Sequence, residues 1–369
     1  MTMKKVFITG AGGFIGGRLV EILKQTSSPE INILLRNVAK AARVSRYPVH
    51  YYRGNTSSEE IIKSAMHGCD VAIHCAHDFA NPLVNLQAAE LIAKQCLVNG
   101  VNKLVYISSF AVHRTDGDER IDEQSAVNEH WDYALNKLAV EKKLLGFYEE
   151  SGLPVVILRP TIVYGPFSTA WTVHTVAQML ENRVVVPFNG ERICNAVYID
   201  DVVNSIIKSI SSPLGCNGKI FLVSGPGTVS WKDYYEGHLQ YNGLNEPYFL
   251  DEEESEKFYA ALKDVQSVTS KTSAFKDPIS FLKKTPVYTI YQRLLKNSSI
   301  RKKLLSAKAG LPRPLIYPSI DAFNNLSCKG KADISRIKAE MNFEPGFTFA
   351  EGMKKTLAWI RWANLNYPG

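Results

Sequence analysis

The chain has 369 residues, of which 45% are hydrophobic and 21% charged, the balance of a soluble globular protein with a sizeable core. No stretch reaches the roughly 18 uninterrupted apolar residues of a membrane-spanning helix, and the six cysteines at unpaired spacings argue against a disulfide framework or a zinc site. MTMKKVFITG runs straight into a strand-like segment and leaves no room for a signal peptide. We therefore expect a cytoplasmic protein without a metal site.

Strand-like and helix-like segments alternate through the first half of the chain. The strand-like runs are KKVFITG, INILLR, VHYYRG, VAIHCA, NKLVYISS and LPVVILRP, all apolar with little alternation, as in strands buried on both faces. Helical patterns lie between them at 16–24, 59–66, 85–98 and 133–150. This order predicts an α/β fold with a doubly wound parallel sheet of the dinucleotide-binding, Rossmann type.

The second half is less regular. We expect a helix at 172–181, a strand turning into a helix in NAVYIDDVVNSIIKSI, a strand at IFLVSG, and helices at SWKDYYEGHLQ and GMKKTLAWIRWA. Residues 1–165 are predicted to form the dinucleotide-binding domain, to which 196–225 return. Residues 166–195 and 226–369 are predicted to form a smaller C-terminal substrate-binding lobe.

A basic, mostly helical insertion is expected at about 251–327. Between Lys271 and Lys338, fifteen Lys and Arg residues stand against three acids, although the whole chain carries a net charge of only +7. Such a stretch attracts phosphate-bearing substrates, anionic membranes or nucleic acid. No recognition module accompanies the charge, so we do not expect nucleic-acid binding. A cover over the substrate pocket, a dimer contact and a peripheral membrane contact stay open as alternatives.

The turn after the first strand carries a glycine motif, VFITGAGGFIGGRLVEIL. In such a turn Gly10 permits the tight bend, Gly13 lets the backbone approach a pyrophosphate, and Gly16 lets the next helix pack on the strand. Phe14 and Ile15 begin that helix, whose N-terminal N–H groups and positive dipole attract an anion. The motif in this context predicts a dinucleotide site.

The Gly-x-x-Gly-x-x-Gly spacing resembles that of the short-chain dehydrogenase/reductase family, and GFIG at 13–16 looks like its extended branch, the NAD-dependent epimerase/dehydratase type. AIHCAH, LRPTIVYGP at 158–166 and VYIDDVV at 197–203 are similar to further segments of that branch, so the resemblance covers nearly the first 230 residues. It implies that Ala76, Pro160 and Val163 line the cofactor site.

The end of the second strand bears on the choice of cofactor. An acid there would bond the adenosine ribose and exclude a 2′-phosphate. This chain has Arg36 instead, followed by Lys40 and Arg43. Charge-assisted contacts from Arg36 favour a 2′-phosphate, so NADP is the expected cofactor and NAD the alternative. Asn55, after the third strand, is expected at the adenine edge.

Tyr133 and Lys137 stand four residues apart, on one face of a predicted helix. A free tyrosine titrates near 10, and a neighbouring ammonium, helped by an oxidised nicotinamide, would favour its phenolate. Both lie downstream of a strand that ends at Ser109, in the order of the family. The resemblance implies that Tyr133 handles the proton, Lys137 tunes it and binds the nicotinamide ribose, and Ser109 orients the substrate oxygen.

The substrate is less defined. Phe110 and Ala111 stand where related dehydratases carry an acid pair, which argues against dehydration. Family members that use sugar nucleotides place an arginine just before the VYIDD-like segment, where this chain has Asn195, with Arg192 slightly earlier. Both are candidate substrate contacts. Asn195 also resembles the pattern of hydroxysteroid and dihydroflavonol-type reductases.

We therefore predict hydride transfer at a secondary alcohol or ketone of a small-molecule substrate. A nucleotide-sugar epimerase or keto-reductase stands ahead of a 3β-hydroxysteroid dehydrogenase/dihydroflavonol reductase-like, NADPH-dependent ketone reductase. A nucleotide-sensing regulator that lost the chemistry is the third alternative. The resemblance also implies a homodimer through the helices predicted at 85–98 and 133–150.

Overall fold

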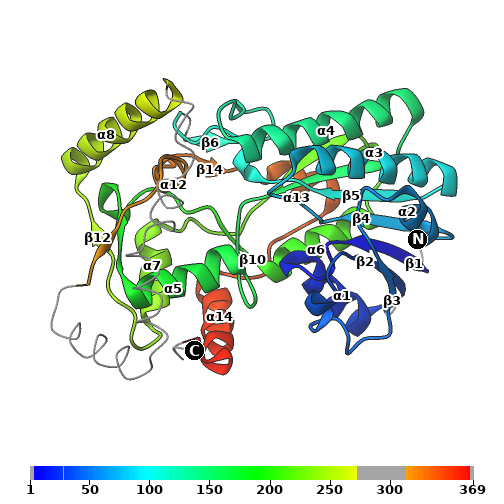
Figure 1. The fold of residues 1–369 in the computed structure, drawn as a ribbon, viewed down its shortest axis with the longest axis horizontal. Helices are drawn as coiled ribbons and strands as arrows, with labels where there is room; N and C mark the ends of the chain where they lie inside the picture. The colour runs from blue at the N-terminus through cyan, green and yellow to red at the C-terminus, as the bar shows by residue number, and fades with distance from the viewer. Residues whose placement is uncertain (1–3, 28, 118, 272–312, 366–369) are drawn as a thin grey trace, which may run out of the picture.

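The computed structural model in Figure 1 describes the chain except for residues 1–3, 28, 118, 272–312 and 366–369. At its centre is a seven-stranded sheet in the order β3-β2-β1-β4-β5-β7-β11, in which every neighbouring pair of strands is parallel. The strands are β1 (Lys5–Thr9), β2 (Glu30–Leu35), β3 (His50–Arg53), β4 (Val71–His74), β5 (Lys103–Ile107), β7 (Val155–Pro160) and β11 (Lys219–Val223). The strand order reverses between β1 and β4, which is where doubly wound sheets bind ligands.

Helices cover both faces of this sheet (Figure 1). One core joins Val6 and Ile8 of β1 to α1 (Phe14–Thr26) and α6 (Ile199–Ile210). The other core joins Phe7 of β1 to α2 (Glu59–Met66), α3 (Pro82–Asn99) and α4 (Asp132–Ser151). Successive β1 side chains thus enter opposite cores, which explains the unbroken apolar run in the sequence.

A smaller group of elements lies beside the central sheet (Figure 1). It contains a parallel sheet of three strands, β12-β9-β13, formed by β9 (Arg183–Val186), β12 (Tyr248–Phe249) and β13 (Leu315–Ile316). Its helices are α5 (His174–Glu181), α7 (Trp231–Leu239), α8 (Glu252–Lys271) and α12 (Ile320–Leu326). A parallel pair, β8 (Ile162–Tyr164) and β10 (Ala196–Tyr198), connects this group to the larger one.

The C-terminal segment returns across the molecule. β14 (Lys331–Ala332) pairs with β6 (Arg120–Ile121), which lies between β5 and α4. α13 (Ser335–Met341) then contacts β11, and α14 (Phe349–Ala363) contacts α7 and β10. The carboxylate of Asp201 holds the segment between α13 and α14, because it accepts the N–H groups of Gly346 and Phe347 at 2.7 and 3.2 Å.

The predicted α/β fold with its doubly wound parallel sheet is confirmed, with small shifts of boundary. The helix expected at 172–181 opens with a π-helical turn, Thr169–Val173, before α5. Of the basic insertion expected at about 251–327, residues 272–312 lie outside the described chain, and α8, β13 and α12 are its described parts. None of the described helices is both long enough and apolar enough to span a bilayer.

Candidate active site

The glycine turn after β1 has the geometry that a dinucleotide site needs. Gly10 has a φ of 73°, and a Cβ atom there would lie 2.8 Å from the backbone of Cys75 and Ala76 at the end of β4. A Cβ atom on Gly16 would overlap the carbonyl oxygen of Gly10. Any side chain at either position would therefore push the turn, α1 and the β4 edge apart.

The N-terminus of α1 is open to an anion. Gly13 caps the helix without a side-chain hydrogen bond, and the first turn contains no acidic residue. The N–H of Gly17 bonds the carbonyl of Gly13 at 3.0 Å, so the amides ahead of it, including those of Phe14 and Ile15, have no carbonyl within the helix. Together with the close approach of Gly10 and Gly16, these donors fit a dinucleotide pyrophosphate.

The residues expected at the adenosine end lie at the same edge of the sheet. Arg36 directly follows β2, its side chain is 67% exposed, and its Nη1 lies 2.5 Å from Asp78 Oδ2. Lys40 belongs to the 3-10 turn Val38–Ala41. A Cβ atom on Gly12 would lie 3.0 to 3.1 Å from Lys40 atoms, so this turn packs directly on the glycine turn. Asn55 is exposed just after β3, the neighbour of β2.

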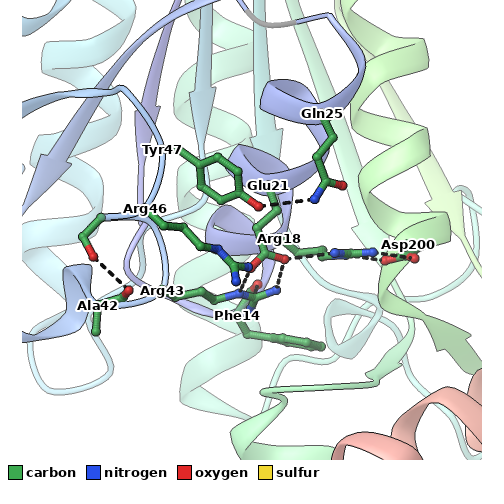
Figure 2. Close-up of polar contacts among 10 residues, drawn as sticks. Phe14, Arg18, Glu21, Gln25, Ala42, Arg43, Arg46, Tyr47 and Asp200 are labelled. Carbon is green, nitrogen blue, oxygen red and sulfur yellow. Dashed lines mark hydrogen bonds and ion pairs between the residues drawn. The ribbon is translucent and has the colours of Figure 1, made fainter.

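Arg43 is placed differently from the expectation that it accompanies Arg36. It makes two 2.8 Å bonds to the carboxylate of Glu21 on α1, and its guanidinium lies 4.2 Å from the ring centroid of Phe167. Arg18 and Arg46 also bond Glu21, and Arg18 reaches Asp200 of α6 (Figure 2). Burial alone would raise the pKa of Glu21, but the bonds from Arg43 and Arg18 lower it to about 2.

Tyr133, Lys137 and Ser109 come together beyond the end of β5. Tyr133 and Lys137 lie one turn apart on α4, with Lys137 Nζ 5.9 Å from the centroid of the Tyr133 ring. Lys137 is buried and donates a 2.8 Å hydrogen bond to the carbonyl of Ile107, the last residue of β5. Ser109, two residues further on, lies near enough to Tyr133 to favour the ionised form of its hydroxyl.

Burial dominates the electrostatics of this group. It raises the pKa of Tyr133, and the neighbouring Ser109 only partly opposes that rise. Burial lowers the pKa of Lys137 to about 8, although Cys75 and Glu141 act in the opposite direction. Lys137 therefore lies near its titration point, while Tyr133 keeps its proton at neutral pH and is set to act as an acid.

Aromatic rings surround Tyr133 on several sides. Phe79 stacks on it with centroids 5.6 Å apart and planes 15° apart, while His77 meets it edge-on at 5.1 Å. Trp131 lies 5.2 Å away on the approach to α4. Burial, helped by the charge of Lys137, lowers the pKa of His77 to about 4, so this ring is neutral at physiological pH. Phe79 itself is 81% exposed, which gives the site an apolar rim.

A buried polar network behind Ser109, Tyr133 and Lys137 was not predicted from the sequence. Arg159 of β7 makes a two-pronged ion pair with Glu141 of α4, and its Nη1 bonds His113 Nε2 at 3.0 Å. Ser108, next to Ser109, donates to the same carboxylate. A signal was present in the sequence, because Glu141 follows Lys137 by one more helical turn. The network joins β5, β7 and α4 directly beneath Ser109 and Lys137.

Of the remaining predicted residues, three were expected to line the cofactor site and Asn195 was expected to contact the substrate. Ala76, whose N–H donates to Thr9 Oγ1 at 3.2 Å, lies against the glycine turn. Pro160 ends β7 beside β11, and Val163 lies in β8. The side chain of Asn195 is buried and used by the backbone, since it donates to the Gly330 carbonyl and accepts from Ala332 N–H, both at 2.9 Å.

Arg192 belongs to the smaller group of elements. Its guanidinium lies 4.4 Å from the ring centroid of Phe188, and its Nη2 is 3.7 Å from Glu252. Its Nε is buried and has no hydrogen-bond partner among the described residues. Phe188 has a φ of 53°, so the arginine stacks on a residue with an uncommon backbone conformation.

Comparison with known proteins agrees with this fold. The model of the NAD dependent epimerase/dehydratase family matches residues 6–223, and the chain belongs to this family, which confirms the resemblance inferred from the glycine motif. The match contains the glycine turn, Ser109, Tyr133 and Lys137, and it ends with β11.

Individual relatives differ in what they act on. The chain is 29% identical over 244 residues to a UDP-glucose 4-epimerase of Vibrio cholerae, covering 62% of this chain and 72% of that protein. It is 22% identical over 380 residues to a 3beta-hydroxysteroid-dehydrogenase/decarboxylase of Arabidopsis thaliana, covering 95% and 78%. The UDP-glucose 4-epimerase structure of Thermotoga maritima shares the fold, with a TM-score of 0.66 at 17% identity over 98% and 99% of the two chains.

Proposed function

We propose that the protein transfers a hydride between a nicotinamide cofactor and a secondary alcohol or ketone of a nucleotide sugar, as an epimerase or keto-reductase. The observation that carries this proposal is the convergence of Ser109, Tyr133 and Lys137 beyond β5, in the same protein as an open glycine turn. The bound nicotinamide supplies the hydride donor or acceptor. Ser109, Tyr133 and Lys137 carry out the proton transfer that accompanies the hydride transfer.

The proton chemistry follows from the electrostatics of the site. Tyr133 keeps its proton because burial raises its pKa, so it donates to a ketone oxygen that is being reduced. Ser109, which lies beside Tyr133, orients that oxygen. This donation leaves a phenolate, which the ammonium of Lys137 stabilises. In the reverse direction that phenolate accepts the proton of an alcohol and becomes a neutral tyrosine again.

A phosphate-bearing substrate is supported by Arg192. Among the described residues its buried Nε has no hydrogen-bond partner, and a guanidinium can bind phosphate oxygens through such an N–H group. We assign residues 166–195 and 226–369 to the lobe that binds the substrate, and 1–165 with 196–225 to the cofactor domain. Asn195 holds the C-terminal segment in this lobe through Gly330 and Ala332. We propose that it acts on the substrate indirectly, by fixing the position of that segment.

A second candidate is a ketone reductase of the 3β-hydroxysteroid or dihydroflavonol type. The apolar rim of Phe79 and Trp131 around Tyr133 favours it, because flat apolar rings stack well on aromatic side chains. The Arabidopsis relative spans 95% of this chain. A nucleotide-sensing regulator is the third candidate, and the intact group of Ser109, Tyr133 and Lys137 argues against it.

The cofactor contacts that we propose are the glycine turn, Arg36, Lys40, Asn55, Ala76, Tyr133, Lys137, Pro160 and Val163. NADP is proposed as the cofactor because Arg36, and not an acid, follows β2. We also propose a homodimer through α3 and α4, which lie side by side on one face of the sheet (Figure 1). Exposed Leu83, Val98 and Leu135 on these helices supply apolar surface for that contact.

The first experiment identifies the nucleotide in freshly purified protein, released by denaturation and separated by chromatography. Stoichiometric bound nucleotide indicates an epimerase that recycles its hydride, and empty protein that binds NAD(P)H indicates a reductase. In either case Tyr133→Phe should lower kcat by roughly 10²- to 10⁴-fold, the usual contribution of a general acid, while the Kd for the cofactor stays the same. A Tyr133→Phe enzyme with unchanged turnover would contradict the proposal.

A further inference from the structure

The arginine that we expect to bind a 2′-phosphate already has a carboxylate partner. Arg36 Nη1 lies 2.5 Å from Asp78 Oδ2, and the side chains are 67% and 18% exposed. The pair contributes to cofactor choice because a 2′-phosphate needs the same guanidinium edge that Asp78 contacts.

The pair spans the glycine turn. β2 and β4 are the two neighbours of β1 in the sheet. Arg36 directly follows β2, and Asp78 comes shortly after β4. Because the carboxyl ends of parallel strands meet at one edge, the ion pair joins the two sides of the turn that follows β1. It therefore lies at the adenosine end of the cofactor groove.

Asp78 is held firmly in this position. Its Oδ1 accepts the N–H groups of Ala80 and Asn81 at 2.9 and 3.2 Å, next to the start of α3. Its own N–H donates to Asn85 Oδ1 at 2.8 Å, and its carbonyl accepts from Asn85 Nδ2 at 2.9 Å. When a phosphate approaches, the exposed arginine can turn toward it, but the carboxylate stays where it is.

We propose that Asp78 is a selectivity residue that disfavours the 2′-phosphate, so that the protein accepts NAD(H) alongside NADP(H). The fixed carboxylate competes with the phosphate for Arg36 and repels its negative charge. A cofactor without the 2′-phosphate neither competes with Asp78 for Arg36 nor is repelled by its carboxylate. The inference rests on the proposed function, because it assumes that this groove binds a nicotinamide dinucleotide.

The test is Asp78→Asn, which removes the charge and keeps a side-chain oxygen for the N–H groups of Ala80 and Asn81. Dissociation constants for NADPH and NADH are measured by titration calorimetry with the full chain. We expect NADPH to bind about three- to tenfold more tightly to the variant, as for the loss of one partly screened charge, while NADH binding stays within about twofold. The gain for NADPH should shrink in roughly 0.5 M salt.

Two further variants serve as controls. Glu30→Gln removes a carboxylate from the ion pair with Lys5 at the opposite end of β2, and should change neither affinity. Arg36→Ala should weaken NADPH binding more than NADH binding. In that background Asp78→Asn should add less than it does alone, because the shared partner is gone.

Each outcome has one meaning. A wild-type protein that holds no co-purified nucleotide and binds neither cofactor contradicts the proposed function itself. Binding of both cofactors with no gain for NADPH in Asp78→Asn, or an equal gain for both, overturns the role of Asp78 and leaves the proposed function standing. A selective gain for NADPH that salt diminishes supports it. Thermal unfolding of all four variants, including the double variant, is compared with wild type to verify that the fold is intact.

Discussion

Two buried carboxylates on opposite faces of the sheet, Glu21 on α1 and Glu141 on α4, invite comparison. Each accepts hydrogen bonds from arginine and each side chain is 3% exposed. Glu141 pairs with Arg159, which is only 5% exposed, and lies beneath the catalytic group. Glu21 bonds three arginines, one of which, Arg46, is 62% exposed. The first network is closed and the second is open to solvent.

The two networks lie in different places: one adjoins the residues of the proposed proton transfer, and the other joins α1 to neighbouring segments. The proposed proton transfer needs Ser109 and Tyr133 at fixed positions, and the closed network joins the elements β5, β7 and α4 that carry or adjoin them. The Glu21 network joins α1 to the segment 38–47 and, through Arg18, to Asp200 of α6. An open network of this kind tolerates the loss of an outer member. The following predictions test that contrast.

The largest effect is expected from opening the closed network. Arg159→Met leaves Glu141 charged and buried without its main partner, which should lower the free energy of unfolding by about 3–5 kcal/mol. Urea unfolding at neutral pH measures the loss. The double variant Arg159→Met/Glu141→Leu should recover much of it, because an apolar pair needs no compensation. If the single variant costs under about 1 kcal/mol, or the double variant is less stable than the single, the network is not closed.

Local sequence patterns predicted the fold and the centre of the site. The glycine motif requires a positive φ and close backbone contacts at fixed spacings. Gly10 shows both, and Gly16 shows the close contact. The strands were predictable because both faces are buried. The helical period alone placed Tyr133 and Lys137 on one face of α4, one turn apart.

The rest depends on contacts between distant segments, which no local pattern encodes. Arg36 meets Asp78, and Arg43 turns to Glu21 and Phe167, because separate loops converge at one edge of the sheet. The burial that raises the pKa of Tyr133 is another property of the packed fold, because side chains from separate segments exclude water from its ring.

Lys137 gives the second prediction, a pH dependence of stability. Burial lowers its pKa from 10.5 in the unfolded chain to about 8 in the fold. Below pH 8 the fold therefore contains a buried ammonium, and this cost disappears as the pH rises from about 8 to 10.5. Relative to Lys137→Met, the wild-type protein should gain up to roughly 3 kcal/mol of unfolding free energy across that window.

Urea unfolding of both proteins at several pH values between 7 and about 10 measures this difference. Lys142→Met is a matched control, because Lys142 lies on the same helix but is exposed. Its difference from wild type should stay flat with pH. A flat difference for Lys137→Met as well would mean that Lys137 reaches solvent and is not desolvated in the fold.

The smallest effects concern the open network. Arg43 and Arg46 bond Glu21 at nearly equal distances, 2.8 and 2.7 Å, but their side chains are 12% and 62% exposed. Arg43→Ala should cost roughly 1–3 kcal/mol, because it removes two charge-assisted bonds and the contact with Phe167. Arg46→Ala should cost under about 1 kcal/mol, as for other exposed ion pairs.

Acid unfolding separates these contributions further. Because Glu21 has a depressed pKa of about 2, its ion pairs stabilise the fold above its unfolded pKa of 4.5 and lose that effect as the pH falls toward 2. The cost of Arg43→Ala should therefore shrink across the same interval, as measured by urea unfolding at pH values from about 5 down to 2.5. Equal costs for Arg43→Ala and Arg46→Ala at neutral pH would show that exposure does not rank these pairs, and that the Glu21 network is as closed as that of Glu141.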